Sequence, residues 1–328
     1  MTALARGIGS RIGQAIGLLL AVVVVVFFLI QIAPGDAALY LAGDQGVGDA
    51  EFLAQVRAEY GLDQPLLVQL GTYVGNVAQL DLGDSIYFNE PVLGLIVERL
   101  FATVLLAGTS LLFAVGLGVA IGVYTARRPE SPMSSAATVT SLVGFSTPVF
   151  YSAIMFIVLF AAKWSLLPVG GIEDVRYDGN WVGETIDLLQ HLILPALSLG
   201  IIYLAIYSRL ARASMLEVLE SDYIRTARAK GARERVVVYK HALRNAIIPV
   251  VTAAGLQVGN LLSGALLVEV VFAWPGIGRL AVDSIFRRDT PTLLGIMIFS
   301  SAMVIVANLL TDLVYRLIDP RIRVGGSR

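Results

Sequence analysis

Long apolar runs alternate with short polar segments along the chain. A transmembrane α-helix needs about 20 consecutive apolar residues, and six runs reach or approach this length: Ile12–Ile32, Leu100–Thr125, Ala136–Ala162, Leu192–Tyr207, Ile247–Val268 and Leu293–Leu310. The fourth run is the shortest, but uncharged residues flank it on both sides. The pattern therefore predicts an all-α polytopic membrane protein with six transmembrane helices.

The composition supports a membrane protein and narrows its class. Only 15% of the residues are charged and 56% are hydrophobic, whereas about a quarter of the residues of a soluble domain are charged. None of the six runs contains Asp, Glu, Lys, Arg or His. Proton- or sodium-coupled transporters and intramembrane proteases need ionisable groups inside the bilayer, so the sequence argues against these classes. A stand-alone channel or a membrane scaffold stays open as an alternative.

The distribution of basic residues indicates the topology. If the first segment is cytoplasmic and the side alternates at each run, the inside segments hold 17 of the 24 Lys and Arg residues. Lys and Arg favour the cytoplasmic side of a membrane protein, which places both termini in the cytoplasm. The outside segment from Asp36 to Glu90 contributes nine carboxylates instead.

The polar segments divide the chain into four predicted parts. These are an N-terminal tail with the first helix (1–33), an extracytoplasmic insertion (34–97), a five-helix core (98–318) and a cytoplasmic tail (319–328). Within the insertion we expect short helices at Asp49–Tyr60 and Pro65–Asn76, followed by a turn at Asp81–Ser85. The insertion is too small to be an independent enzyme domain, so we expect it to pack on the outer ends of the helices.

The most basic stretch of the chain belongs to the predicted cytoplasmic loop 208–246 and extends into the next span. From Ser221 to Pro249 it contains seven basic residues: Arg225, Arg228, Lys230, Arg233, Arg235, Lys240 and Arg244. Ser221 or Asp222 is placed to cap a short helix. Gly231 is placed to end that helix after about two turns, because Gly adopts the left-handed conformation at low cost, and a second basic helix is expected to lead into the next span. Such a segment either docks a cytoplasmic partner or contacts anionic headgroups, and the capped two-turn helix favours docking.

Glycine and proline mark special places within the spans. The pairs Gly118-x-x-x-Gly122 and Gly255-x-x-x-Gly259 allow close helix approach, although Gly is also simply common in membrane helices. Ser146-Thr147-Pro148 lies inside the third run and predicts a kink, because proline leaves a backbone carbonyl without its partner. Pro195 is expected in the first turn of the fourth helix, where proline is tolerated.

Polar residues within the spans are candidates for a substrate path: Ser146, Thr147, Gln257 and Asn260. Gln257 and Asn260 are three positions apart and therefore share a helix face. The alternative is that these side chains form hydrogen bonds between helices, which contribute only about 0.6 kcal/mol on average.

Motifs typical of enzymes are absent from the sequence. There is no G-x-x-x-x-G-K-[ST] loop, no H-E-x-x-H and no G-x-S-x-G, so we expect no catalytic residue and no ATP hydrolysis by this chain. The chain has no cysteine and only two histidines, which argues against a metal site. No cofactor is expected to bind this chain itself.

The segment Asp222–Gly231 resembles the cytoplasmic EAA loop of ABC-importer permeases, which reads E-A-A, three residues and then Gly. More closely, the chain resembles the first permease subunit of the dipeptide/oligopeptide/nickel branch. The stretches that carry this resemblance follow one another along nearly the whole chain: Gly61–Pro65, Asp81–Ser85, His191–Leu199, Val271–Leu280, Arg288–Pro291 and Asp319–Arg323. Arg225-Thr226-Ala227 stands where the general motif has Glu-Ala-Ala, so only Ala227 and Gly231 match it directly.

The resemblance implies a type I ABC importer permease fold, and it implies that the following residues couple the chain to an ATPase: Asp222, Tyr223, Arg225, Thr226, Ala227 and Gly231. The implied partners are a homologous second permease subunit, two ABC ATPase subunits that use ATP and Mg²⁺, and an extracytoplasmic peptide-binding protein. Lipid would surround the helices, and no nucleic acid is expected. The expected function is ATP-driven import of di- or oligopeptides across the bacterial plasma membrane by alternating access. Import of nickel or another small solute by the same machinery is the alternative.

Overall fold

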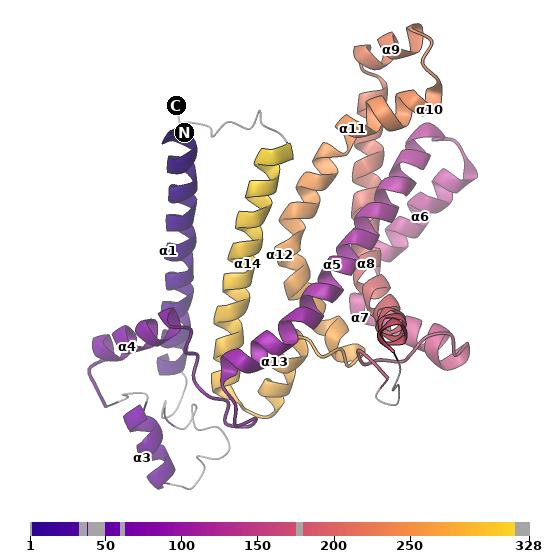
Figure 1. The fold of residues 1–328 in the computed structure, drawn as a ribbon. Coiled ribbons are helices and arrows are strands. Elements are labelled where there is room, and N and C mark those ends of the chain that lie inside the picture. Colours follow the sequence, from indigo (N-terminus) through magenta and orange to yellow (C-terminus); the bar gives the residue numbers. More distant parts are fainter. Residues whose placement is uncertain (1, 33–37, 39–49, 60–62, 175–179, 319–328) are drawn as a thin grey trace. The chain divides into compact units, whose positions relative to one another are not determined.

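The computed structural model describes residues 2–32, 38, 50–59, 63–174 and 180–318 of the 328-residue chain (Figure 1). The described residues are mostly helical, with an isolated bridge between Asp84 and Pro91 and no named strand among them. The described residues divide into two compact units: those within 2–102 and 275–309 form the first, and those within 103–274 and 310–318 form the second.

The first unit contains the following helices or parts of them: α1 (Thr2–Ile32), α3 (Ala50–Glu59), α4 (Leu66–Ala78), α5 (Val92–Arg127), α13 (Ile277–Phe286) and α14 (Thr290–Ile318). Helix α4 lies across one end of α1 (Figure 1). There Tyr73, Val74 and Val77 pack against the buried side chains of Val23 and Val26. A second apolar cluster joins α5, α13 and α14: Val92, Leu95, Ile96, Ile277, Leu280, Ala281 and Ile296.

The second unit is built around α8 (Trp181–Leu219) and includes the rest of α5 and the end of α14. Its other elements are α6 (Pro132–Ser146), α7 (Val149–Phe156), the π-helical η2 (Ile157–Lys163), α9 (Asp222–Ala229), α10 (Glu234–Val236), the π-helical η3 (Val237–Ala242), α11 (Leu243–Ala246) and α12 (Ile248–Val271). Helix α8 packs against α6, α7, α11, α12 and η3. Most of the other elements of this unit therefore pack against α8.

Helices α5 and α8 approach closely at the predicted glycine pair. A Cβ added at Gly122 would lie 2.5 Å from the Cβ of Ala211 and 2.7 Å from the carbonyl oxygen of Ser208. A Cβ added at Gly118 would lie 2.9 Å from the Cβ of Tyr207. Real side chains do not fit at such distances, so the prediction of close packing at this pair is confirmed.

Four helices in the described ranges are long and apolar enough to cross a membrane: Arg11–Ile32 within α1, Val92–Arg127, Trp181–Leu219 and Thr290–Thr311 within α14. The predicted third span is broken, because α6 ends at Ser146 and α7 begins at Val149. Thr147 between them is extended (φ −89°, ψ 127°), as expected for a residue before proline, which confirms the kink at Pro148. The predicted fifth span is α12, whose 24 residues extend over about 36 Å.

Several helices are longer than the apolar runs that predict them. Helix α5 begins at Val92, inside the predicted 34–97 insertion, and α8 begins at Trp181. The side-chain oxygen of Asn180 accepts a hydrogen bond from the Gly183 amide at 3.1 Å and caps α8 well before its apolar run. Pro195 therefore lies in the interior of α8, and its predicted placement in the first turn is wrong.

The insertion contains the expected short elements. Helices α3 and α4 confirm the two predicted helices, while Asp49 and Tyr60, the predicted ends of the first, lie outside the described residues. The turn after α4 is held by Asp81, whose Oδ1 accepts from the Gly83 amide at 3.0 Å. Gly83 has a φ of +81° there, a conformation that glycine adopts readily.

Candidate functional site

Helix α9 forms a hairpin with α10 beyond the end of α8 (Figure 1). Ser221 occupies its N-cap position with an extended backbone, but its side chain makes no capping bond. Its hydroxyl donates instead to the carbonyl oxygen of Val218 at 2.6 Å. Asp222 lies in the first turn, where a carboxylate stabilises the positive end of the helix dipole. The helix therefore begins where the sequence predicts.

The end of α9 depends on Gly231. Its φ is +80°, and its amide donates to the Arg228 carbonyl at 2.9 Å, while the Ala232 amide donates to the Ala227 carbonyl at 3.2 Å. These two bonds form a Schellman motif, in which the residue at the position of Gly231 is left-handed. The predicted role of Gly231 as the stop of this helix is confirmed.

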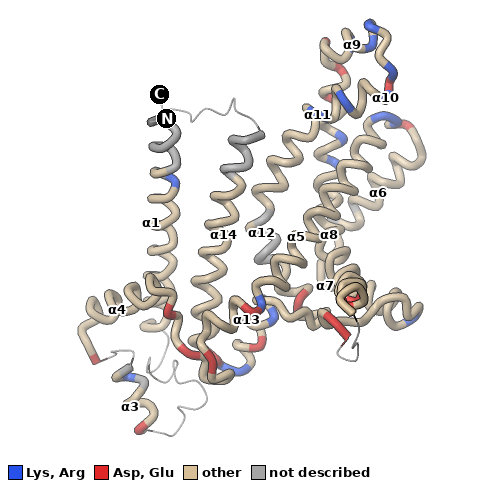
Figure 2. The backbone as a smooth tube through the Cα atoms, viewed as in Figure 1, with Lys and Arg blue, Asp and Glu red and all other residues tan. Residues whose placement is uncertain are grey.

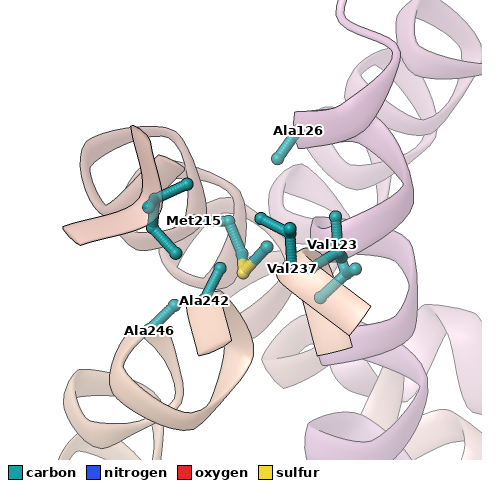
Figure 3. Packing of buried hydrophobic residues seen from close by; sticks show 8 residues of the cluster. Val123, Ala126, Met215, Val237, Ala242 and Ala246 are labelled. Atoms are coloured by element: carbon teal, nitrogen blue, oxygen red, sulfur yellow. The ribbon is translucent and has the colours of Figure 1, made fainter. Parts of the chain in front are cut away.

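One face of α9 is buried in the second unit. Ile224 is fully buried, and Ala227 is partly buried against the same apolar cluster. The other members of this cluster, which we call the α9 anchor, come from α5, α8, η3 and α11: Val123, Ala126, Met215, Val237, Val238, Ala242 and Ala246. Figure 3 shows Met215, Val237 and Ala242 near its centre. The anchor fixes α9 to the ends of two long helices.

Two polar contacts tether α9 to the segment that follows it. Arg228 donates twice to the Glu234 carboxylate, from Nε at 3.2 Å and from Nη2 at 2.9 Å. This hydrogen bonding, together with the charge of Arg228, lowers the pKa of Glu234 below its ordinary value of 4.5. The Asn245 amide donates to the Tyr223 hydroxyl at 2.8 Å, so α9 is attached to α11 as well.

The other side of α9 is open to solvent. The side chains of Asp222 and Arg225 are 96% and 71% exposed and form an ion pair at 3.4 Å. Thr226 is also exposed, and its hydroxyl donates to the Asp222 carbonyl at 2.9 Å. Figure 2 shows further Lys and Arg residues along the hairpin. This side of α9 therefore presents both acidic and basic side chains to solvent. The opposite face of the helix is held by the anchor.

The structure thus brings all six predicted coupling residues together on α9 and its C-terminal end. Three of them hold the helix in place. Tyr223, Ala227 and Gly231 hold the helix in place through the tether, the anchor and the stop. The other three, Asp222, Arg225 and Thr226, are exposed, and so are Tyr223 and Gly231. Their assignment to an ATPase contact stays a prediction.

The four predicted path residues lie in α6, α12 and the kink between α6 and α7. Ser146 is exposed at the end of α6, and the Thr147 hydroxyl donates to the Val143 carbonyl of its own helix at 2.7 Å. Gln257 is half-buried in α12, and the side chain of Asn260 lies outside the described residues. Their role in a substrate path stays a prediction.

A buried carboxylate that the hydrophobic pattern missed lies near the end of α12. Glu269 is fully buried and accepts a hydrogen bond from Thr103 Oγ1 of α5 at 2.7 Å. The fifth apolar run stops at Val268, whereas α12 continues to Val271, so the helix that contains the predicted fifth span also contains an ionisable residue. The six apolar runs themselves contain no ionisable residue, as stated above, because Glu269 lies one position beyond the fifth run. The position of Glu269 directly after the run was the available signal.

Two family matches together cover most of the chain. The family described as "Binding-protein-dependent transport system inner membrane component" matches residues 118–324. Its N-terminal counterpart, "Binding-prot-dependent transport system membrane comp, N-term", matches residues 4–107. This chain belongs to the family of binding-protein-dependent transport system inner membrane components. It is therefore a permease-type membrane component of a transport system and not a catalytic subunit, which sets aside the stand-alone channel or scaffold.

Curated relatives match the chain along almost its full length. The dipeptide transport system permease protein DppB of Escherichia coli (strain K12) is 41% identical over 330 residues, which cover 95% of this chain and 97% of the relative. A putative peptide permease protein of Brucella suis is 42% identical and covers 96% and 98%. The oligopeptide transport system permease protein AppB of Bacillus subtilis is 38% identical and covers 94% and 96%.

Solved structures confirm the predicted fold class. The MetNI methionine ABC transporter in an inward-facing conformation matches with a TM-score of 0.54 at 17% identity, covering 69% of this chain and 96% of that one. An amino acid ABC transporter matches with a TM-score of 0.52, also at 17% identity, covering 68% and 94%. At this identity the likeness shows the fold alone, which is that of an ABC importer permease.

Proposed function

We propose that this chain is the transmembrane permease subunit of an ATP-driven ABC importer of di- and oligopeptides, and that α9 is the element on which an ATPase subunit docks. The observation that supports the docking role is the structure of α9, which is exposed on one side and fixed to α5, α8 and α11 on the other. The cargo is supported by the relatives at 38% to 42% identity, whose names refer to dipeptides, peptides or oligopeptides. These names favour peptides over nickel or another small solute.

The anchor supplies a path for force from α9 into the bundle. Ile224 packs in one cluster with Val123 of α5 and Met215 of α8. Close-packed side chains transmit displacement because the cluster has little free volume to absorb it. When ATP binding moves the docked ATPase, α5 and α8 therefore move with α9, and the bundle changes between its inward- and outward-open states. The Arg228–Glu234 and Tyr223–Asn245 contacts keep the hairpin from bending instead.

The proposed assembly contains this chain, a homologous second permease subunit, two ABC ATPase subunits that bind ATP and Mg²⁺, and an extracytoplasmic peptide-binding protein. We place α9 and both termini on the cytoplasmic side of the bacterial plasma membrane, as the distribution of Lys and Arg favours. No cofactor and no nucleic acid is assigned to this chain, and lipid contacts the outside of its helices.

Docking on α9 can be tested with a single thiol, because the natural chain has no cysteine. In the intact complex, Thr226→Cys should crosslink to an ATPase subunit through a reagent that joins a thiol to a partner lysine. Lys163→Cys is the matched control, since Lys163 is exposed at the end of η2 on the predicted opposite side of the membrane. Absence of ATPase adducts at residue 226, or equal adducts at both positions, would contradict docking on α9.

The cargo is tested separately on the same preparation. ATP hydrolysis by the reconstituted complex should rise when the binding protein is loaded with a di- or oligopeptide and stay at its basal rate when the protein is empty. A rise with nickel and none with peptides would assign the chain to the alternative cargo while leaving the docking result intact.

A further inference from the structure

Helix α4 is an apolar helix that the rest of the chain leaves uncovered. Its 13 residues include no Asp, Glu, Lys, Arg or His, yet none of them is buried. In its first turn, Leu66 and Val68 are exposed, and the side chain of Leu67 between them is 81% exposed. A helix that is apolar around most of its circumference is normally covered by a protein core or by lipid. Helix α4 therefore needs a cover that this chain does not supply.

The polar residues of α4 lie on the side toward its neighbouring helices. Gln69, Thr72 and Asn76 line a small cavity of about 50 Å³ together with residues of α1 and α14. There the Gln31 side-chain amide of α1 donates to Gln69 Oε1 at 2.8 Å. Leu67 is two positions from Gln69 and so lies on the opposite side of a helix with 3.6 residues per turn. The outward side of α4 is therefore its apolar side.

The contacts between α4 and α1 place α4 at the level of a membrane span. Both the apolar run of α1 and its membrane-length segment end at Ile32. The rings of Tyr73 and Phe27 lie 5.8 Å apart, centroid to centroid, and Val74 packs against the cluster that contains the buried Val23. At 1.5 Å per residue, Phe27 is about 7.5 Å inside the end of the run. Helix α4 therefore crosses α1 within the apolar run and not beyond it (Figure 1).

The surface of α1 beside α4 is also apolar. Val25, Leu29 and Ile32 are exposed side chains within the membrane-length segment of α1. Surfaces that face hydrocarbon carry no charged groups, because a charge there is costly. Helix α3 of the same insertion carries Glu51 and Arg57 instead and is suited to water. The uncharged outward side of α4 therefore matches lipid.

We propose that α4 is an in-plane membrane helix, which lies in the interfacial layer of the bilayer at the extracytoplasmic end of α1 with Leu67 and Val68 in the hydrocarbon. Helices of this kind bury their apolar side about 5–10 Å into the boundary between headgroups and acyl chains, a depth that agrees with the contact at Phe27. A water-soluble partner does not reach this level, whereas lipid surrounds a membrane span there. In this position α4 braces the end of α1 against vertical movement.

Spin labels can test the position of α4, because the natural chain has no cysteine. The intact complex carries a label on Leu67→Cys, has partner subunits without reactive cysteines, and is reconstituted in phospholipid vesicles. Collisions of the label are measured with oxygen, which partitions into hydrocarbon, and with water-soluble chromium oxalate. We expect collisions mainly with oxygen and a depth of about 5–10 Å below the headgroup boundary. Gln55→Cys on the exposed side of α3 is the matched control and should collide mainly with chromium oxalate.

The alternatives to lipid give different results. A label at residue 67 that collides mainly with chromium oxalate, as at residue 55, would place α4 in water. A label protected from both reagents would place it against a protein partner, and either result would overturn the proposal. Val68→Cys supplies a second label with the same expectation should Leu67→Cys not assemble. These results are independent of crosslinking at Thr226, so failure here leaves the docking of an ATPase on α9 untouched.

Discussion

The Ser85 hydroxyl donates a hydrogen bond to the Asp289 carboxylate at 2.5 Å, although 204 positions separate the two residues. The same Asp289 oxygen accepts from Thr292 Oγ1 at 2.7 Å, and all three side chains are buried. Within the first unit, this contact joins the turn that precedes α5 to the start of α14. Near this contact, the Cζ atom of Arg287 lies over the Tyr87 ring, 3.8 Å from its centroid. The C-terminal part of the insertion is therefore held to the start of α14.

Removal of the Asp289 carboxylate should destabilise this junction. Asp289→Ala leaves the buried hydroxyls of Ser85 and Thr292 without their acceptor, and each unsatisfied buried group costs about 1–3 kcal/mol. We expect a clear fall in the melting temperature of the detergent-solubilised protein. The control is Asp84→Ala, which removes an exposed carboxylate from the same turn. Equal melting temperatures for the two variants would show that the Ser85–Asp289 contact contributes little.

The backbone at Gly231 should tolerate only residues that accept a positive φ. A Cβ there would have no heavy atom within 4 Å, so the cost of substitution is conformational, roughly 1–2 kcal/mol for an ordinary residue. We expect Gly231→Val to lower the amount of peptide imported per ATP hydrolysed, and Gly231→Asn to retain most of it, because Asn enters the left-handed region more readily. The measurement is peptide uptake and phosphate release in the same proteoliposomes. If Val and Asn behave alike, the loss does not come from the backbone.

The anchor of α9 should depend on Ile224. Ile224→Ala removes a fully buried side chain and leaves a cavity, a change that typically costs about 2–5 kcal/mol. We expect uptake to fall steeply while the ATPase subunits still hydrolyse ATP, since the change loosens the link between them and the bundle. Val236→Ala is the control, because Val236 is an aliphatic residue of the same hairpin with an exposed side chain. Full uptake by Ile224→Ala would argue against force transmission through the anchor.

The Arg228–Glu234 tether should weaken in acid. Because the folded-state pKa of Glu234 is lower than its ordinary value of 4.5, the tether stabilises the hairpin fully above that value. Its contribution is lost as the pH falls through the lowered pKa, when the carboxylate is protonated. The side chains of Arg228 and Glu234 are 41% and 52% exposed, so solvent screens the pair and the effect should be below about 1 kcal/mol.

A spin label on Thr226→Cys reports this change as increased mobility of α9 below pH 4.5. The label should respond to pH in the otherwise natural chain and stay equally mobile at all pH values in a Glu234→Gln background. The same acid response in both backgrounds would assign it to another group.

The local features of this chain were readable from the sequence because each depends on neighbouring residues. The apolar runs indicated the spans, since crossing the bilayer requires a fixed length of hydrocarbon-compatible helix. Asp222 and Gly231 indicated the ends of α9 through the helix dipole and the left-handed backbone. The kink at Pro148 followed from the missing amide hydrogen of proline. The starts of helices were predicted less accurately. The start of α8 after Asn180 is an example, because a polar capping residue lies outside the apolar pattern.

Contacts between distant residues were decided by the tertiary structure alone. Ser85 and Asp289, or Thr103 and Glu269, are ordinary polar residues in the sequence, and only the packing of helices brings each pair within hydrogen-bond distance. The sequence did not decide whether Gly122 is a site of close helix packing or simply a residue common in membrane helices. The structure decided this, because Ala211 lies against Gly122. The sequence by itself determined the class of the protein, its spans and the short helix of its basic loop. The tertiary structure decided which face of that helix is anchored and which carboxylates are buried, because these depend on pairings across many turns of chain that no local pattern encodes.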